Sequence, residues 1–141
     1  MKNYLSLVTF SHTVFALPFA IIGFTLGITQ PGAAFEWTDL LLVVACMVFA
    51  RSAAMAFNRY IDADIDKKNA RTAQREIPKG VISSKNALYF VIGSSIAFMI
   101  CALLLNKLCF FLSPVALLVI LGYSYTKRFT WLCHFILGIG L

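Results

Sequence analysis

The sequence predicts an all-α fold: a polytopic bundle of transmembrane helices with four full spans plus the start of a fifth. Hydrophobic residues make up 60% of the 141 residues and charged residues only 13%, whereas a soluble domain has about 25% charged residues. The mean hydropathy is +0.84. The apolar residues also stand in blocks of spanning length and are not scattered along the chain.

Each apolar block is bounded by polar or turn-forming residues, and a bilayer core requires about 20 apolar residues per helix. Pro18 lies within the first block, where we expect it to kink the helix. Pro114 lies in the first half of the fourth block. We expect spans at about 8–28, 40–60, 87–105 and 108–126, a partial span at 131–141, and a loop at about 61–86.

The basic residues predict the orientation of the bundle. The net charge is +6, and seven of the twelve Lys and Arg residues lie within 59–85. Lys2, Lys127 and Arg128 fall on the same side by span counting. Because cytoplasmic loops carry an excess of Lys and Arg, the N-terminus and the long loop are expected in the cytoplasm. The same distribution argues against a nucleic-acid partner.

Arg51 and four cysteines stand inside or beside apolar blocks. An intramembrane Arg costs about 2.5 to 3.5 kcal/mol on insertion scales, so Arg51 either faces a partner inside the bundle or snorkels toward the cytoplasm. Cys46, Cys101, Cys109 and Cys133 show no C-x-x-C spacing. We interpret them as small buried hydrophobic residues rather than as disulfides or metal ligands.

The motif NRYIDADID runs from Asn58 to Asp66 at the end of the second block. In a continuous helix, Asn58, Asp62 and Asp66 share one face at positions i, i+4 and i+8. Two carboxylates four residues apart repel each other, and a divalent cation such as Mg²⁺ would relieve that repulsion. A calcium EF-hand is excluded, because Lys67 and Ala73 stand where its Gly and Glu are required.

Two basic segments could complete a phosphate site. Arg71 and Arg75 are four apart in RTAQREIPKG, and arginine suits bidentate phosphate contacts. A solvated loop or contact with anionic lipid heads is the alternative. Tyr123 and Lys127 share a helix face and could meet a phosphate, or could serve as an interfacial aromatic and a positive-inside anchor. His12, near the first span, is given no catalytic role.

Three ordered signatures resemble one family, the UbiA-type membrane prenyltransferases. NRYIDADID followed by RTAQREIPKG is similar to its first aspartate-rich signature, NxxxDxxxD with an RTxxRxxPxG tail. FSHTVFALPFA resembles the first helix of the 4-hydroxybenzoate polyprenyltransferase branch, and YSYTKRFT resembles its Tyr-x-x-x-Lys element. The resemblance covers essentially residues 1–141, as the N-terminal part of such a membrane domain.

The resemblance implies transfer of a polyprenyl group from polyprenyl diphosphate onto an aromatic acceptor such as 4-hydroxybenzoate, in ubiquinone or menaquinone biosynthesis. Many family members carry Asp where this chain has Arg59. Carried onto this sequence, the implied roles are Mg²⁺ binding by Asn58, Asp62 and Asp66, catalysis by Asp62, Asp66 and Lys127, and substrate binding by Asn58, Arg59, Arg71, Arg75 and Tyr123.

The resemblance also implies a location and a limit. It places the protein in a bacterial-type inner membrane among lipids, with the active-site side cytoplasmic and no nucleic-acid partner. The family has about nine spans and a second aspartate-rich motif, whereas this sequence has no Asp or Glu after Glu76. We therefore expect this stretch to be inactive alone. The alternative function is a non-catalytic membrane protein or truncated remnant that binds lipid or diphosphate.

Overall fold

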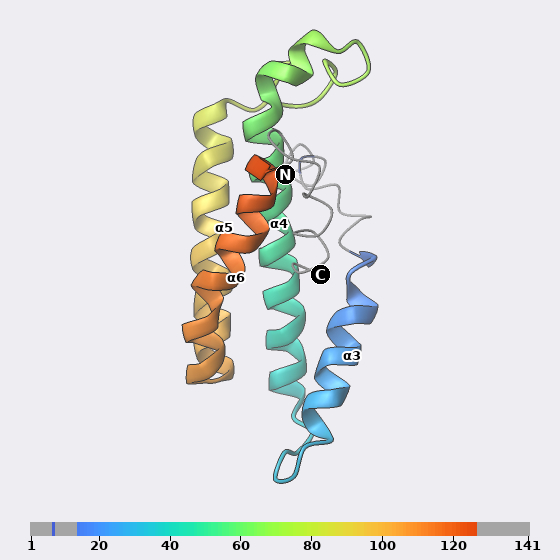
Figure 1. Cartoon of the computed structure of the whole chain (residues 1–141), viewed down its shortest axis with the longest axis vertical. Coiled ribbons are helices and arrows are strands. Elements are labelled where there is room, and N and C mark those ends of the chain that lie inside the picture. The colour runs from blue at the N-terminus through green and yellow to red at the C-terminus, as the bar shows by residue number, and fades with distance from the viewer. Residues whose placement is uncertain (1–6, 8–13, 127–141) are drawn as a thin grey trace.

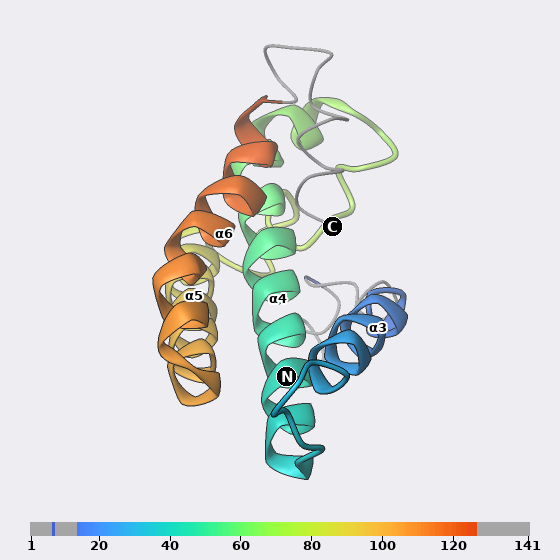
Figure 2. The same cartoon turned by 60° about the horizontal axis from the view of Figure 1, so that its bottom comes forward.

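The computed structural model describes residue 7 and residues 14–126. Every regular element in these residues is a helix, which confirms the predicted all-α class. Helix α4 contacts each of the other three helices. Figures 1 and 2 show it between α3 on one side and the α5–α6 pair on the other. The helices are α3 (Leu17–Ile28), α4 (Trp37–Lys68), α5 (Ser84–Leu105) and α6 (Lys107–Thr126).

Three of the helices, α4, α5 and α6, are long and apolar enough to cross a membrane, within the part of the chain that the structure describes. They correspond to the expected spans at 40–60, 87–105 and 108–126. Helix α3 has 12 residues and covers the second half of the expected first span. Residues 8–13, with His12, and the expected partial span at 131–141 lie outside the described residues.

The two prolines are accommodated in different ways. Pro18 lies in the first turn of α3, where a missing N–H is tolerated because first-turn donors have no helical partner. It therefore lies at the start of the described helix, and the expected kink within a longer span stays a prediction, because residues 8–13 lie outside the described residues. Pro114 lies inside α6. It cannot donate to the carbonyl of Phe110, and the hydroxyl of Ser113 donates to that oxygen instead, at 2.8 Å.

Small residues line the contacts between helices, and large apolar residues point outward. Ala53 and Ala56 on α4 and Ala87 on α5 are fully buried. Phe111 and Leu118 on α6 are more than 70% exposed. Small side chains let helix backbones approach closely, and large apolar side chains outside need a lipid environment. This inverted distribution agrees with an integral membrane bundle.

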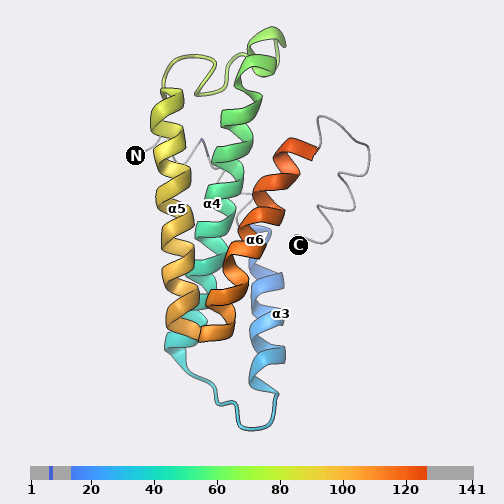
Figure 3. The same ribbon diagram turned by 60° about the vertical axis from the view of Figure 1, so that its left-hand side comes forward.

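The far end of α4 differs from the expectation drawn from the sequence. At 1.5 Å per residue, its 32 residues extend about 48 Å, well beyond a hydrocarbon core of about 30 Å. The helix continues through residues 61–68 and ends at Lys68, whereas a loop was expected from about residue 61. The end of α4, the start of α5 and the end of α6 all lie at the same end of the bundle, below the connecting loop (Figures 1 and 3).

The α4–α5 loop, residues 69–83, is packed onto this end of the bundle. Ile77 and Ile82 are buried and join Ala56, Ala63 and Val91 in one apolar cluster. Helix α5 then begins after an N-cap, where the Ser83 side chain accepts from the N–H of Asn86 at 3.2 Å. The largest buried apolar cluster of the described residues therefore lies directly under the polar motif.

Three of the four cysteines lie within the described residues, one on each of helices α4, α5 and α6. Cys46, Cys101 and Cys109 are free thiols and are half-buried. The Cys46 thiol lies 4.0 Å from the carbonyl oxygen of Phe98 on α5. They act as small packing residues between helices, while Cys133 lies outside the described residues.

Candidate functional site

The acidic face consists of Asn58, Asp62 and Asp66, and all three belong to the continuous helix α4. Asn58 and Asp62 are half-buried, and Asp66 is only 5% exposed. Asp64 lies on the opposite side, with a side chain 92% exposed, and forms an ion pair with Lys67 at 3.8 Å. The regular spacing therefore separates an inward-facing set of oxygen ligands from one solvated carboxylate.

Asp66 is held by Arg75 from the α4–α5 loop. One guanidinium nitrogen, Nη1, donates to both carboxylate oxygens, at 2.9 Å to Oδ1 and 2.7 Å to Oδ2. The Asp66 side chain is 7% exposed and that of Arg75 is 32% exposed. The structure thus brings together a residue predicted to bind metal and a residue predicted to bind phosphate, and pairs them with each other.

Local hydrogen bonds set the path of the loop around this pair. The hydroxyl of buried Thr72 donates to the backbone carbonyl of Asp66 at 3.2 Å. The Asn69 side chain accepts from the N–H of Arg71 at 3.0 Å. Gly80 has φ +77°, a conformation that residues with a Cβ rarely adopt. These contacts fold the segment back over the end of α4, so that Arg75 reaches Asp66.

The remaining predicted basic residues have different positions. Arg59 is half-buried and interacts electrostatically with Arg75, Glu76, Asp66 and Asp62. It therefore belongs to the same charge cluster as the acidic face. Arg71 is exposed on the loop, and Lys127 lies outside the described residues.

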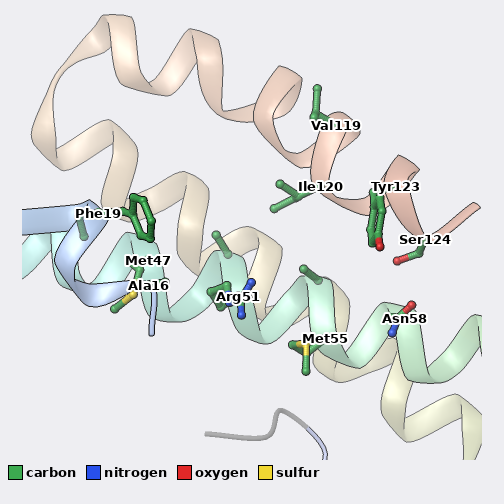
Figure 4. A pocket seen from close by; sticks show the side chains of 13 residues that line it. Ala16, Phe19, Met47, Arg51, Met55, Asn58, Val119, Ile120, Tyr123 and Ser124 are labelled. Atoms are coloured by element: carbon green, nitrogen blue, oxygen red, sulfur yellow. The ribbon is translucent and has the colours of Figure 1, made fainter. Parts of the chain in front are cut away.

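A cavity of about 370 Å³ lies between α3, α4 and α6. Figure 4 shows Asn58 on α4 and Tyr123 on α6 projecting into it from facing helices. Arg51 also lines it, which supports the interior-facing interpretation over snorkelling. The other lining residues are apolar or small apart from Ser124: Ala16, Phe19, Ala20, Met47, Ala50, Ala54, Met55, Val119 and Ile120.

The cavity was not predicted from the sequence, although one signal for part of it was present. Met47, Arg51 and Met55 recur every four residues, so they fall along one face of α4. Asn58 continues that face three residues later and belongs to both the cavity and the acidic motif. Following the face of Asn58, Asp62 and Asp66 toward the N-terminus of the helix would have identified these residues from the sequence. The contributions of α3 and α6 depend on tertiary packing.

The oxygen atoms of the acidic face fit a Mg²⁺ ion only if phosphate oxygens complete its coordination. Among the described residues there is no group of three or more His, Cys, Asp or Glu side chains that could hold a metal ion. Asn58, Asp62 and Asp66 offer two carboxylates and one amide oxygen. Mg²⁺ is usually bound through one or two carboxylates together with substrate phosphates and water. These residues fit such a shared site and do not form a self-contained metal cage.

The fold and the site together define a class: a helical integral membrane protein with a charge cluster at one end of the bundle and a largely apolar cavity beside it. A family model described as the UbiA prenyltransferase family matches residues 16–141. The chain belongs to this family, as its motifs had indicated.

Curated relatives and a solved structure agree. The chain is 36% identical over 105 residues to a 4-hydroxybenzoate octaprenyltransferase of Aliivibrio fischeri, covering 74% of this chain and 37% of the relative. It is 40% identical over 102 residues to the protein of that name from Vesicomyosocius okutanii, covering 72% and 37%. The apo structure of a UbiA homolog from Aeropyrum pernix K1 matches with a TM-score of 0.83 and 39% identity, over 92% of this chain and 46% of that one.

The extent of these matches is itself informative. The chain spans little more than a third of the length of these curated relatives and less than half of the solved homologue. The matched part includes the acidic face and the helices around the cavity.

Proposed function

We propose that this chain forms the diphosphate-binding and acceptor-binding part of a Mg²⁺-dependent aromatic prenyltransferase. The enzyme would transfer a polyprenyl group from polyprenyl diphosphate onto an acceptor such as 4-hydroxybenzoate in quinone biosynthesis. It would lie in a bacterial-type inner membrane as four full spans and the start of a fifth. The N-terminus and the acidic face would be cytoplasmic, as the basic residues of 59–85 favour.

The single observation that carries the proposal is the continuity of one face of α4. Arg51 and Asn58 line the apolar cavity, and Asp62 and Asp66 follow on the same helix face. Seven residues of helix place Arg51 about 10 Å from Asn58 along the axis. A diphosphate at the acidic end and an aromatic ring in the cavity would therefore lie end to end along a single helix.

At the acidic end, we assign side-chain oxygen atoms to Mg²⁺ and mainly cationic side chains to the diphosphate. Asn58, Asp62 and Asp66 would hold Mg²⁺ together with the diphosphate. Phosphate contacts would come from Arg59, Arg71, Arg75, Tyr123 and Lys127, which carry positive charge or a donor hydroxyl.

In the cavity, Arg51 is the natural partner for an acidic acceptor. Among the described residues that line the cavity, only Arg51 and the phenol of Tyr123 are ionisable, and the remaining walls are largely apolar. A benzoate carries one carboxylate on a flat apolar ring, and a guanidinium binds carboxylates in a planar geometry. The curated relatives named above act on 4-hydroxybenzoate by their names, which agrees with this charge match.

These positions support the following reaction as part of the proposal. The bond between the first prenyl carbon and the diphosphate oxygen breaks, and the electron pair leaves with the diphosphate. A carbon–carbon bond forms to the acceptor ring, and the proton on that ring carbon is released to solvent. Cations placed in advance around the leaving oxygens stabilise the charge that develops there. Mg²⁺, when bound with the diphosphate, adds charge neutralisation at the same oxygens.

Calorimetry on the 141-residue chain in lipid nanodiscs tests this assignment. Geranyl diphosphate should bind only when Mg²⁺ is present. The double variant Asp62→Ala, Asp66→Ala should lose that binding. Asp64→Ala is the matched control, because it removes a carboxylate from the opposite, exposed side of the same helix turn, and it should bind as the wild type does.

Diphosphate binding that survives in the double variant would overturn the site assignment. A wild-type chain that binds no diphosphate with Mg²⁺ would favour the alternative, a membrane protein that only binds lipid. Adding 4-hydroxybenzoate in the same preparation tests the cavity separately, since Arg51 and the acidic face contribute to different ligands.

A further inference from the structure

The ion pair between Asp66 and Arg75 uses both residues in a way that the proposed function does not need. Both oxygens of the Asp66 carboxylate accept from Nη1 of Arg75, at 2.9 Å and 2.7 Å. The carboxylate is nearly inaccessible, at 5% exposure for the residue. A metal ion approaching the acidic face would meet an Asp66 whose charge is already neutralised.

The backbone of Arg75 is fixed in place, and its side chain retains access to solvent. Its N–H donates to the carbonyl of Thr72 at 3.0 Å, and its own carbonyl accepts from the N–H of Lys79 at 3.0 Å. Ile77, two residues on, is buried in the cluster under the loop. About a third of the Arg75 side chain is exposed. The guanidinium can therefore change partner by side-chain rotation while the loop stays in position.

The surrounding charges favour such an exchange. Arg59 interacts electrostatically with Arg75, which repels it, and with Asp62, Asp66 and Glu76, which attract it. The guanidinium groups of Arg59 and Arg75 thus belong to one charge cluster with these three carboxylates. A divalent metal cannot join them easily while Arg75 neutralises Asp66, because it would add positive charge beside two guanidinium groups. A diphosphate brings the negative charge that would draw Arg75 away.

We propose that Arg75 is an exchange residue: it holds Asp66 while the site is empty and transfers to a phosphate oxygen when diphosphate binds, releasing Asp66 to the metal. This inference rests on the proposed function. Its consequence is that metal and diphosphate bind cooperatively, since each removes the partner that blocks the other. Such a coupling is reciprocal by thermodynamic necessity.

The test uses the full chain in nanodiscs of zwitterionic lipid, with two ligands measured separately. Mn²⁺ replaces Mg²⁺ as the probe, and electron paramagnetic resonance reports the unbound ion in the absence of phosphate. Inorganic pyrophosphate binding is measured by calorimetry in saturating Mg²⁺. In Arg75→Gln we expect Mn²⁺ alone to bind about tenfold more tightly than in the wild type. We expect pyrophosphate to bind more weakly.

The opposite signs of these two changes separate exchange from loss of structure, because a loosened loop would weaken both ligands. Lys79→Gln is the matched control. It removes one positive charge from an exposed position in the same loop and should leave Mn²⁺ affinity unchanged. Arg75→Lys guards against misfolding of Arg75→Gln. It retains the charge beside Asp66, so it should keep the weak Mn²⁺ affinity of the wild type and lose affinity for pyrophosphate.

Two results would overturn the inference. If Arg75→Gln binds Mn²⁺ no more tightly than the wild type, Arg75 does not restrain Asp66, and the proposed function still stands provided that wild-type protein binds Mg²⁺ with pyrophosphate. If Arg75→Lys gains Mn²⁺ affinity as Arg75→Gln does, the charge of residue 75 is not the cause. A failure of every variant and of the wild type to bind either ligand would instead remove the diphosphate site, and the exchange with it.

Discussion

Helix α4 has different surroundings at the cavity and at its charged end. Around Arg51 its neighbours are methionines, alanines and apolar residues of α3 and α6. At Asp66 its neighbours come from the α4–α5 loop and are held by defined hydrogen bonds and one short ion pair. Beneath this charged end lies the apolar cluster that includes Ile77 and Ile82.

This difference agrees with the two kinds of ligand in the proposed function. An apolar ring in a cavity tolerates small displacements, because dispersion and burial are not directional. A metal and a diphosphate require oxygen and nitrogen atoms at fixed distances. The chain accordingly anchors its polar loop in the buried cluster. The described residues that line the cavity are half-buried or exposed, apart from buried Ser124.

The largest effect is expected from overpacking the cluster under the charged end. Ala56 is fully buried among Ala63, Val91 and their neighbours, so Ala56→Leu inserts atoms where there is no space. We expect it to lower the free energy of unfolding by about 2–3 kcal/mol. Denaturation in detergent, followed by circular dichroism, measures this change.

Leu104→Ala is the control variant for Ala56→Leu. Leu104 is 65% exposed on α5, and the substitution should change the stability little because the removed atoms face lipid. Equal stability of Ala56→Leu and the wild type would show that α4 and α5 are not closely packed at this level.

The next effect concerns the cavity. Arg51→Met removes its fixed positive charge and keeps an unbranched apolar side chain of similar reach. Loss of a charged hydrogen bond to a carboxylate should weaken 4-hydroxybenzoate binding about tenfold or more. Binding of geranyl diphosphate with Mg²⁺ should be unchanged, because Arg51 lies two helical turns from the acidic face.

Calorimetry with each ligand measures the two affinities. Arg51→Lys should retain part of the acceptor affinity, since it keeps the charge but loses the planar fork. An Arg51→Met protein that binds 4-hydroxybenzoate as tightly as the wild type would place the acceptor elsewhere.

The sequence predicted the fold class and the positions of three long apolar helices, because these depend on local composition. Runs of apolar residues identify membrane helices from their length alone. The end of α4 was predicted only in part: the spacing of the acidic motif required a continuous helix, but the loop was expected to begin at about residue 61. The helix continues to Lys68 since Ala63 is buried against the bundle and Asp66 is paired with Arg75. Both are tertiary contacts.

The candidate site could be predicted in part for the same reason. The acidic face follows from the spacing of Asn58, Asp62 and Asp66 in a helix. The ion pair between Arg75 and Asp66 could not be predicted. Asp66 was assigned to the metal and Arg75 to the phosphate, and only the conformation of the loop between them brings the two side chains into contact. The cavity required α6 to bring Tyr123 opposite Asn58, which no local pattern specifies.

A third prediction compares two glycines at opposite ends of α4. Gly32 and Gly80 have φ +85° and +77°, and an added Cβ at either would meet no atom within 4 Å. Each substitution by alanine should therefore cost about 1 kcal/mol through backbone strain alone. Only Gly80→Ala should also weaken Mg²⁺-dependent diphosphate binding, because Gly80 belongs to the loop that carries Arg75.

Thermal unfolding and diphosphate calorimetry on both variants test this pairing. Gly32→Ala serves as the control for general strain. Equal losses of diphosphate affinity in the two variants would show that the loop conformation does not position the site.

The smallest effect is expected at the exposed ion pair one turn from the buried one. Lys67 and Asp64 lie 3.8 Å apart with side chains 58% and 92% exposed. Water screens such a pair, and ordering two flexible side chains offsets most of the attraction, so Lys67→Ala should change the free energy of unfolding by no more than about 0.5 kcal/mol. Raising the salt concentration should leave that difference nearly unchanged. A loss of unfolding free energy several times larger would mean that Lys67 also stabilises the buried ion pair of Asp66 and Arg75. The exposed and the buried ion pairs at the charged end of α4 would then be energetically coupled and not independent.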